Sequence, residues 1–202
     1  MRVVLASHNQ GKLAELRSLL VPRGWDLTDP AALEIPSPPE LRPTFVENAL
    51  DKARHVAAAS GLPALADDSG LVVPALGGKP GIWSARFAGA GATDAENNAR
   101  LIEAIAGLDQ PAAYYYCVLV FLRHPEDPAP VVAAGAWHGR LLGMPRGGAG
   151  FGYDPLFLLP SLDRTAAELD PAQKNRMSHR ARAMAGLLAG MDDATGGDQR
   201  AS

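Results

Sequence analysis

The sequence predicts an α/β protein whose mixed β-sheet is flanked by helices. Two observations predict this class. Strand-like and helix-like segments alternate along most of the chain, as they do in α/β proteins. In the middle, however, two long strand-like runs at about 113–123 and 131–142 are separated only by the short stretch "HPEDPAP". So short a connection makes a hairpin of antiparallel strands, and we therefore expect a mixed sheet rather than a pure Rossmann fold.

Apolar spacing and helix caps locate the remaining elements. Short apolar runs predict strands, and leucines that recur at helical spacing predict helices. Thr44 with Glu47, and Thr93 with Glu96, have the spacing of a capping box that opens a helix. The expected elements, in order, are a strand at 2–6, a helix at 12–20, a helix from 44 that stops at Gly61, strand-like residues at 64–67 and 71–74, a helix from 93 to 107, the two long strands, and a last helix from about 178 to 191.

The composition is that of one globular domain. Of the 202 residues, 47% are hydrophobic and 20% are charged, which is enough apolar material for a sizeable core. We expect a single domain over residues 1–191, followed by a small, polar and disordered tail over residues 192–202. The one cysteine, Cys117, excludes an internal disulfide and is expected to be a small core residue.

Charge and hydropathy exclude two classes of partner. The net charge of −3 gives no sign of a basic surface for nucleic acid. The apolar part of the N-terminus is too short for a signal peptide. The longest apolar run, Ala112 to Leu122, is well below the roughly 20 residues of a membrane span. We therefore expect a cytoplasmic protein that binds neither nucleic acid nor membrane.

The first candidate site is "SHNQGK", between the first strand and the first helix. Backbone N–H groups at a helix N-terminus attract anions, and Lys12 adds a positive charge, so the segment is similar to a phosphate-binding loop. It is not a Walker A loop, because the leading glycine is missing and Leu13 stands where a serine or threonine would bind the metal. An alternative of equal weight is a polar turn in which Asn9 caps the helix. The residues of this segment are Ser7, His8, Asn9, Gln10, Gly11 and Lys12.

Two adjacent carboxylates, Asp67 and Asp68, interrupt the apolar stretch "ALADDSGLVV". Side chains alternate along an extended chain, so we expect the two carboxylates to face opposite ways, one into a site and the other onto a structural hydrogen bond. A carboxylate beside a phosphate site usually indicates Mg²⁺, which takes oxygen ligands. The alternative is an Asx-type turn made with Ser69 and Gly70.

Three further segments carry candidate binding residues. Lys52, on the helix that begins at Thr44, is placed to reach a phosphate. Phe151 lies among glycines in "GGAGFGYDPLF", where its ring either stacks on a base or is buried beneath a surface loop. In "KNRMSHRARAM", His179 and Arg180 stand in the first turn of a helix, against its dipole. That placement predicts a ligand or an acidic partner, the alternative being a solvated basic turn. Together these are the parts of a nucleotide site.

Six segments occur in an order and at spacings that resemble the inosine triphosphate pyrophosphatase family. They are "SHNQGK", "TFVENALDKA", "LADDSGLVV", "LGGKPGIWSARFAG", "GFGYDPLF" and "SHRARA", and they extend over roughly residues 2–190. The resemblance implies an elongated mixed-sheet α/β fold with two lobes around a central cleft, a Mg²⁺ cofactor and a homodimer. It also implies hydrolysis of non-standard purine nucleoside triphosphates (dITP, ITP and XTP) to the monophosphate and pyrophosphate.

The resemblance further implies roles for single residues. Asp68 matches the position of a catalytic base and metal ligand, and Glu40 matches a metal-binding glutamate. Family members often have Thr-Gly after that glutamate, whereas this chain has Leu-Arg-Pro, and His8 stands where glycine is frequent. Substrate contacts are then expected from Ser7, His8, Asn9, Gln10, Gly11, Lys12, Lys52, Ser69, Phe151, Gly152, Tyr153, Asp154, Lys174, His179 and Arg180.

The expected reaction is attack of water on the α-phosphorus, with pyrophosphate as the leaving group. Lys12, Lys52 and Lys174 are expected to neutralise phosphate charge. Asp68 either activates the water or holds the metal that does so. Two alternatives remain: a Maf-type pyrophosphatase would prefer pyrimidine triphosphates, and a regulatory nucleotide-binding module would release no pyrophosphate. The "SHR" segment after "GFGYD" favours the purine enzyme.

Overall fold

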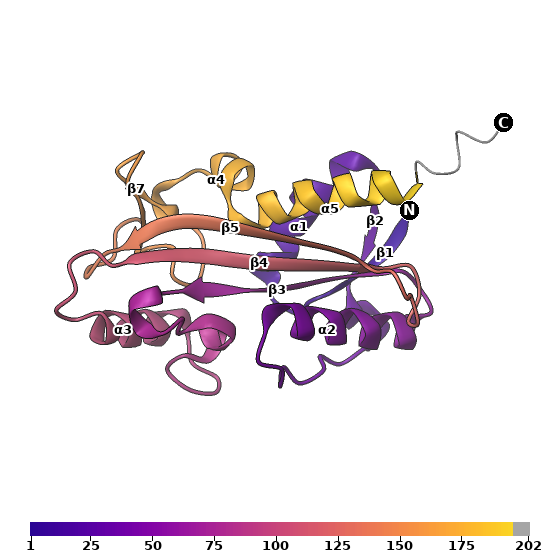
Figure 1. The fold of residues 1–202 in the computed structure, drawn as a ribbon, viewed down its shortest axis with the longest axis horizontal. Coiled ribbons are helices and arrows are strands. Elements are labelled where there is room, and N and C mark those ends of the chain that lie inside the picture. The colour runs from indigo at the N-terminus through magenta and orange to yellow at the C-terminus, as the bar shows by residue number, and fades with distance from the viewer. Residues whose placement is uncertain (196–202) are drawn as a thin grey trace. The chain divides into compact units, whose positions relative to one another are not determined.

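The structure, a computed structural model, describes residues 1–195, and within them it contains a seven-stranded sheet (Figure 1). The strands are β1 (Arg2–Ala6), β2 (Asp26–Thr28), β3 (Ala64–Val72), β4 (Ala112–Leu122), β5 (Val131–Leu141), β6 (Phe157–Leu159) and β7 (Arg164–Thr165). Their order is β2-β1-β3-β4-β5-β6-β7. β1 is parallel to β2 and β3, whereas β6 is antiparallel to β5 and β7. The predicted α/β class with a mixed sheet is therefore confirmed.

The helices begin where the sequence places a cap. The Asn9 side chain accepts a hydrogen bond from the Lys12 N–H, and Thr44 caps the second helix in the same way. Thr93 and Glu96 form both halves of a capping box. None of the helices in the described part of the chain is long and apolar enough to cross a bilayer. The α-helices are α1 (Gln10–Leu20), α2 (Phe45–Ser60), α3 (Asp94–Ala104), α4 (Pro171–Met177) and α5 (His179–Thr195).

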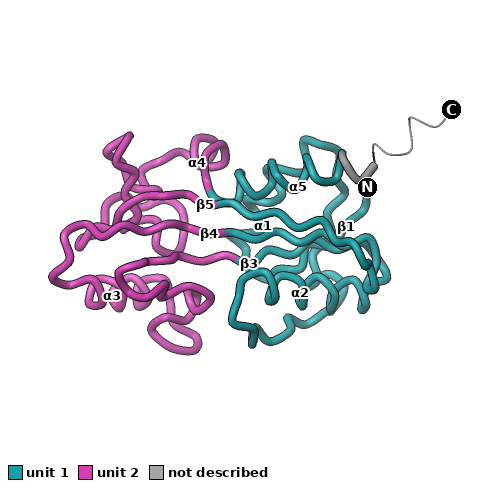
Figure 2. Tube along the Cα trace, viewed as in Figure 1, with its two compact units in different colours: residues 1–68, 117–135, 179–202 teal, residues 69–116, 136–178 magenta. Residues whose placement is uncertain are grey.

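The chain divides into two compact units (Figure 2). The first unit contains residues 1–68 and 117–135 and the segment that begins at residue 179, and the second contains residues 69–116 and 136–178. The boundaries between the units fall inside β3, β4 and β5, so each of these strands contributes residues to both.

In the first unit, helices cover both faces of β1. Val3 and Leu5 pack with Leu13 and Leu16 of α1 in one buried cluster, to which α5 also contributes. Val4, between them in sequence, is equally buried and points to the opposite face, because side chains alternate along a strand. That opposite face is covered by α2 (Figure 1). β3 pairs with β1, so its side chains on the two faces of the sheet also contact different helices.

In the second unit, the core lies between α3 and the sheet. Leu101 of α3 is fully buried in a cluster with aromatic residues of β4, β5 and β6. The rings of Tyr115 and Phe157 pack there with their centroids 4.7 Å apart. Trp137 packs on Phe157 at 5.3 Å. This aromatic core supports the strands from which the glycine-rich segment at 143–155 departs.

The alternative of an Asx-type turn at Ser69 and Gly70 is not what the structure shows. β3 runs without interruption from Ala64 to Val72, through both aspartates. Gly70 serves a different purpose, because a Cβ atom there would lie 2.3 Å from the carbonyl oxygen of Gly81 and 2.5 Å from the hydroxyl of Ser84. A side chain at position 70 would collide with this neighbouring segment, so glycine permits close packing rather than a turn.

The C-terminal segment differs from expectation in its helices. The predicted last helix is α5, which begins at His179, but a further helix, α4, precedes it and ends at Met177, with Ser178 in an extended conformation between the two. α5 continues to Thr195, beyond the point at which the sequence places the start of the tail. Residues 196–202 of that predicted tail lie outside the described residues.

Candidate active site

Asp67 and Asp68 point to opposite faces of β3, as side-chain alternation predicts. On one face, an Asp67 oxygen lies 2.6 Å from the ammonium of Lys12, which α1 carries. On the other, an Asp68 oxygen lies 2.9 Å from the ammonium of Lys52, which α2 carries. Both aspartates and both lysines belong to the first unit. The two carboxylates are therefore available for different tasks.

Asp67 is the centre of a buried polar cluster. Besides Lys12, it accepts hydrogen bonds from the Arg180 Nε at 3.2 Å and from the Cys117 thiol at 3.1 Å. Its side chain is fully buried. Burial by itself would raise the pKa of Asp67, but the positive charges of Lys12 and Lys52 outweigh it and hold that pKa below its usual value. Asp67 is therefore a charged carboxylate that ties α1 and α5 to the sheet.

Arg180 has its acidic partners within the chain. Its guanidinium is 1% exposed and also pairs with Glu15 of α1. Burial lowers the pKa of Arg180 to about 10, so it stays charged at neutral pH. Of the alternatives for this basic turn, the structure shows the acidic partner. His179 precedes it as the first residue of α5 and is also buried.

Asp68 is held differently from Asp67. The Lys52 ammonium bridges Asp68 and Glu40, at 2.9 Å from an oxygen of each. The second oxygen of Asp68, Oδ2, is buried and has no hydrogen-bond partner among the described residues. Burial raises the pKa of Asp68, and attraction to Lys52 and Lys12 offsets this only in part. For Lys52, burial lowers the pKa, but attraction to Asp68 and Glu40 prevails and raises it.

Glu40 reaches this cluster in spite of the altered residues that follow it. The Arg42 N–H donates to Asn48 on α2 at 3.0 Å, the Asn48 amide donates back to the Arg42 carbonyl at 3.2 Å, and the Arg42 guanidinium pairs with Asp51. The segment is thus fastened to the helix that carries Lys52. The Leu-Arg-Pro sequence therefore leaves Glu40 beside Lys52 and Asp68.

The residues of this cluster fit a magnesium ion. The described residues contain no group of three or more His, Cys, Asp or Glu side chains that could enclose a metal. Mg²⁺, however, is usually bound through one or two carboxylates together with water and substrate phosphates. Asp68 and Glu40 converge on the same ammonium, and Asp68 retains a buried oxygen for a further partner. This donor set is of the kind that Mg²⁺ takes.

The segment Ser7 to Lys12 forms the capping turn that one alternative requires, and phosphate binding there stays a prediction. Asn9 caps α1, as the polar-turn alternative requires. The N–H groups of Gln10 and Gly11 lie in the first turn, where a helix has no internal acceptors for them. The His8 ring bonds the Ile35 carbonyl at 3.1 Å and Ser37, and His8 is not among the residues with positive φ. The histidine therefore needs no conformation reserved for glycine.

In the second unit, Asp154 organises the glycine-rich loop. Its carboxylate accepts from the Phe151 N–H at 3.0 Å, from the Lys174 ammonium at 2.5 Å and from the Tyr115 hydroxyl at 3.2 Å. The Lys174 ammonium also lies 4.7 Å from the centre of the Phe151 ring. Glycine is required at position 150, where φ is +79° and a Cβ would meet the Asp154 carboxylate at 2.1 Å.

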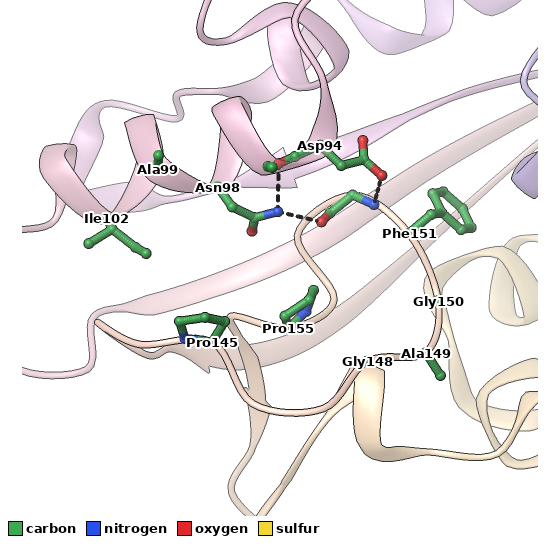
Figure 3. A pocket seen from close by; sticks show the side chains of 12 residues that line it. Asp94, Asn98, Ala99, Ile102, Pro145, Gly148, Ala149, Gly150, Phe151 and Pro155 are labelled. Carbon is green, nitrogen blue, oxygen red and sulfur yellow. Dashed lines mark hydrogen bonds between the residues drawn. The ribbon is translucent and has the colours of Figure 1, made fainter.

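The loop buries Tyr153 rather than Phe151. Tyr153 belongs to the core cluster, and its hydroxyl donates to the Ser84 carbonyl at 2.8 Å. Phe151 is half-buried and lies outside that cluster. Phe151, Ile102 and Pro145 are among the residues that line a pocket of about 470 Å³ between α3 and the loop, and in Figure 3 the Phe151 ring points away from the other two. The alternative in which the Phe151 ring is tucked into the core is therefore not what the structure shows.

Comparison with known proteins decides the family. Residues 3–190 match the Ham1 family. The chain belongs to the Ham1 family. A protein of Aromatoleum aromaticum named dITP/XTP pyrophosphatase is 56% identical over 193 residues, which cover 96% of this chain and 98% of the relative. A protein of the same name from Ralstonia nicotianae is 55% identical, over 93% of this chain and 94% of the relative.

Solved structures agree with this membership. A HAM1 protein from Coxiella burnetii is 45% identical and superposes with a TM-score of 0.87, over 96% of this chain and 99% of that one. The Ham1 protein of Staphylococcus aureus is 34% identical, with a TM-score of 0.84 over 96% and 100% of the two chains. The resemblance to the inosine triphosphate pyrophosphatase family is confirmed.

Three residues at the sites of this Ham1-family chain were not among the candidates. Glu15 pairs with Arg180, Cys117 donates to Asp67, and Tyr115 donates to Asp154. The sequence places Glu15 among the polar positions of an amphipathic helix, and nothing around it indicates an ion pair with Arg180. Cys117 and Tyr115 lie in the strand-like run "YYYCVLVFL", where apolar packing was the natural interpretation. Among the expected residues, Ser69 follows Asp68 on β3 and is half-buried.

Proposed function

We propose that this chain is a Mg²⁺-dependent enzyme that hydrolyses non-standard purine nucleoside triphosphates, dITP, ITP and XTP, to the monophosphate and pyrophosphate. Its role would be to remove these nucleotides from the nucleotide pool. The observation that carries the proposal is the cluster of Asp68, Lys52 and Glu40, in which a buried carboxylate oxygen of Asp68 lacks a hydrogen-bond partner among the described residues. Such an oxygen requires a further partner, and a metal ion or a reacting water supplies one.

The enzyme class agrees with the relatives. Curated proteins that share more than half of their residues with this chain are named dITP/XTP pyrophosphatase, and they are matched over nearly their whole length. The predicted class, a hydrolase that acts on nucleoside triphosphates, is therefore confirmed. The choice of dITP, ITP and XTP, and the requirement for Mg²⁺, are proposed here on the strength of the site residues.

In the proposed reaction, Asp68 accepts a proton from water as the water oxygen bonds to the α-phosphorus. The bond from that phosphorus to the bridging oxygen breaks, and pyrophosphate leaves with the electron pair. Asp68 is suited to this task because its buried Oδ2 has no hydrogen-bond partner among the described residues. When bound by Asp68 and Glu40, Mg²⁺ would neutralise phosphate charge. Lys52 holds both carboxylates in place by its two ion pairs.

Phosphate binding is assigned to the start of α1. The N–H groups of Gln10 and Gly11 and the positive end of the helix dipole favour an anion at this point. Lys12 adds charge, but its ammonium is paired with Asp67. We therefore propose that Lys12 and Asp67 act together, with Asp67 fixing the lysine rather than meeting the substrate.

Base binding is assigned to the loop of the second unit. The half-buried Phe151 ring offers a stacking surface. The Lys174 ammonium lies beside this ring and pairs with Asp154, so in place of the phosphate role expected for it we propose that Lys174 donates to the C6 oxygen of hypoxanthine or xanthine. Arg180, expected from the resemblance to contact the nucleotide, is bonded to Asp67 and Glu15, and this geometry favours a supporting role for it. The homodimer and the cytoplasmic location stay predictions.

The test is pyrophosphate release from a panel of triphosphates, with Mg²⁺ and with EDTA. We expect rapid release from dITP, ITP and XTP with Mg²⁺, little from GTP and ATP, and none in EDTA. A preference for dTTP would favour the Maf-type alternative instead. Binding of XTP without any release of pyrophosphate would identify a regulatory module, and either result would refute the proposal.

A further inference from the structure

Helix α3 binds both backbone polar groups of Gly152, its N–H and its carbonyl oxygen. Its N–H donates to the Asp94 carboxylate at 2.6 Å, and its carbonyl accepts from the Asn98 side-chain amide at 2.8 Å. Figure 3 shows the two side chains reaching from the helix to the loop. All three residues belong to the second unit. We call this arrangement the Gly152 clamp.

The positions of the Asp94 and Asn98 side chains in the clamp are fixed by helix α3. Asp94 and Asn98 are four residues apart, so they lie on the same face of α3, one turn from each other. The Asn98 amide also donates to the Asp94 backbone carbonyl at 2.7 Å, which fixes its side chain against the helix. Both partners of that amide are carbonyl oxygens, so the orientation of the Asn98 side chain is determined. Gly152 meets it with a φ of +61°, a conformation that favours glycine.

The clamp is separate from the cap of the same helix. The N-terminus of α3 is capped by Thr93, whose hydroxyl accepts from the Glu96 N–H at 3.3 Å while the Glu96 carboxylate accepts from the Thr93 N–H at 2.7 Å. The Asp94 carboxylate takes no part in this box and is directed to Gly152 instead. Capping therefore does not account for Asp94.

Gly152 directly follows Phe151, whose own N–H is bound by Asp154. The two peptide groups that flank Phe151 are thus held by Asp154 on one side and by Asp94 on the other, and Asn98 holds the peptide group that follows. A ring that stacks on a base contributes more affinity if its position is set beforehand, because ordering it during binding costs free energy. We propose that Asp94 and Asn98 are positioning residues that hold the Phe151 loop ready for the purine base. This inference rests on the proposed function.

The test compares four variants in pyrophosphate release from XTP. Asp94→Ala and Asn98→Ala should each raise KM about 2- to 10-fold, the range of one hydrogen bond, with kcat little changed. Inhibition by pyrophosphate, which has no base, should stay as in the wild type. Asp94→Asn keeps an acceptor oxygen and should restore the wild-type KM. Asn98→Asp is isosteric but sets a carboxylate against two carbonyl oxygens, so it should exceed the effect of Asn98→Ala.

Glu96→Ala is the matched control, because it weakens the N-terminus of α3 without touching Gly152. It should lower thermal stability and leave KM for XTP unchanged. Hydrogen exchange of the peptide that contains Gly152 gives a readout without turnover: exchange should be faster in Asp94→Ala than in the wild type and the control.

Each outcome bears on the inference. An unchanged KM in both alanine variants, or an equal rise in Glu96→Ala, would overturn the positioning role while the proposed function stands. Unaltered exchange at Gly152 in Asp94→Ala would overturn the clamp itself. A wild-type protein that releases no pyrophosphate from XTP would refute the proposed function and the positioning role with it, whatever the exchange data show.

Discussion

At the scale of single residues, the pKa values of the neighbouring Asp67 and Asp68 are shifted in opposite directions. The positive charges around Asp67 hold its pKa below the usual value, although it is fully buried, whereas burial dominates at Asp68 and raises its pKa. Folding therefore favours the charged form of Asp67 and disfavours the charged form of Asp68. The sequence places the two side by side, and their separate roles follow from the helices that each one faces.

Replacing Asp68 with Asn should abolish most turnover and leave the protein folded. The change removes the proton acceptor, which typically costs about 10²- to 10⁴-fold in rate, and removing a metal ligand adds to this loss. Burial disfavours the charged form of Asp68, and Lys52 keeps Glu40 as a partner, so the loss of stability should be smaller than in Asp67→Asn. Steady-state kinetics with Mg²⁺ and urea unfolding measure both. A folded Asn variant with most of its activity would show that Asp68 is not the catalytic carboxylate.

Replacing Asp67 with Asn should chiefly destabilise the fold, whereas the Asp68 replacement chiefly lowers activity. Lys12 and the buried Arg180 would lose the charge that compensates them. Breaking a buried ion pair in this way costs about 3–5 kcal/mol in the free energy of unfolding. Urea unfolding of the Asp67 and Asp68 variants side by side gives the comparison. Equal stability of the two variants would contradict the separate roles assigned here.

At the scale of elements, the β4–β5 hairpin depends on one aspartate in its loop. Asp127 accepts hydrogen bonds from the backbone N–H and the guanidinium of Arg123 and from the Ala129 N–H. The hydrogen bond from the Arg123 side chain is the main cause of a lowered pKa at Asp127. The stretch "HPEDPAP" is thus a hairpin loop organised by a charged side chain.

The stabilising effect of Asp127 should depend on pH. Its folded pKa lies below its unfolded pKa of about 3.9, so the stability it adds is present above that value and is lost as the pH falls toward the folded pKa. Asp127→Asn should therefore lower the free energy of unfolding by about 1 kcal/mol at neutral pH. Below about pH 4 the difference from the wild type should shrink. A difference that stayed constant from pH 7 to pH 3 would exclude this explanation; urea unfolding across the range measures it.

At the scale of the whole molecule, each of the two units has its own polar cluster. In the first unit, Lys52 joins Asp68 to Glu40, and in the second, Asp154 gathers Lys174 and the Phe151 backbone. β3, β4 and β5 each contribute residues to both units. Ligands that bind the native protein stabilise it as a whole, because they bind the folded state and not the unfolded one.

Mg²⁺ with pyrophosphate should therefore raise the melting temperature. At a ligand concentration of about 100 Kd, the expected stabilisation is about 2.7 kcal/mol. The rise should vanish in EDTA and be reduced in the Asp68→Asn variant, which lacks the proposed metal ligand. Thermal unfolding followed by circular dichroism measures the shift. The same rise with and without Mg²⁺ would show that the pyrophosphate site does not involve the metal.

Local patterns in the sequence determined a large part of this protein. The caps at Asn9, Thr44 and Thr93 start three helices where predicted, and the hairpin around residues 124–130 makes the sheet mixed. The opposed directions of Asp67 and Asp68 followed from alternation alone. These features depend on residues within a few positions of each other, and short-range sterics and hydrogen bonding are enough to specify them.

Only the tertiary structure decided which groups the two carboxylates meet. Arg180 bonds Asp67 from 113 residues away, and Cys117 does so from 50. The unbroken course of β3 was likewise not predictable, because the need for glycine at position 70 comes from Gly81 and Ser84, which pack against it. Such contacts form only when the strands pair and the helices pack on the faces of the sheet. The physical reason is that packing joins residues distant in sequence, whereas local periodicity reports only which face a residue takes.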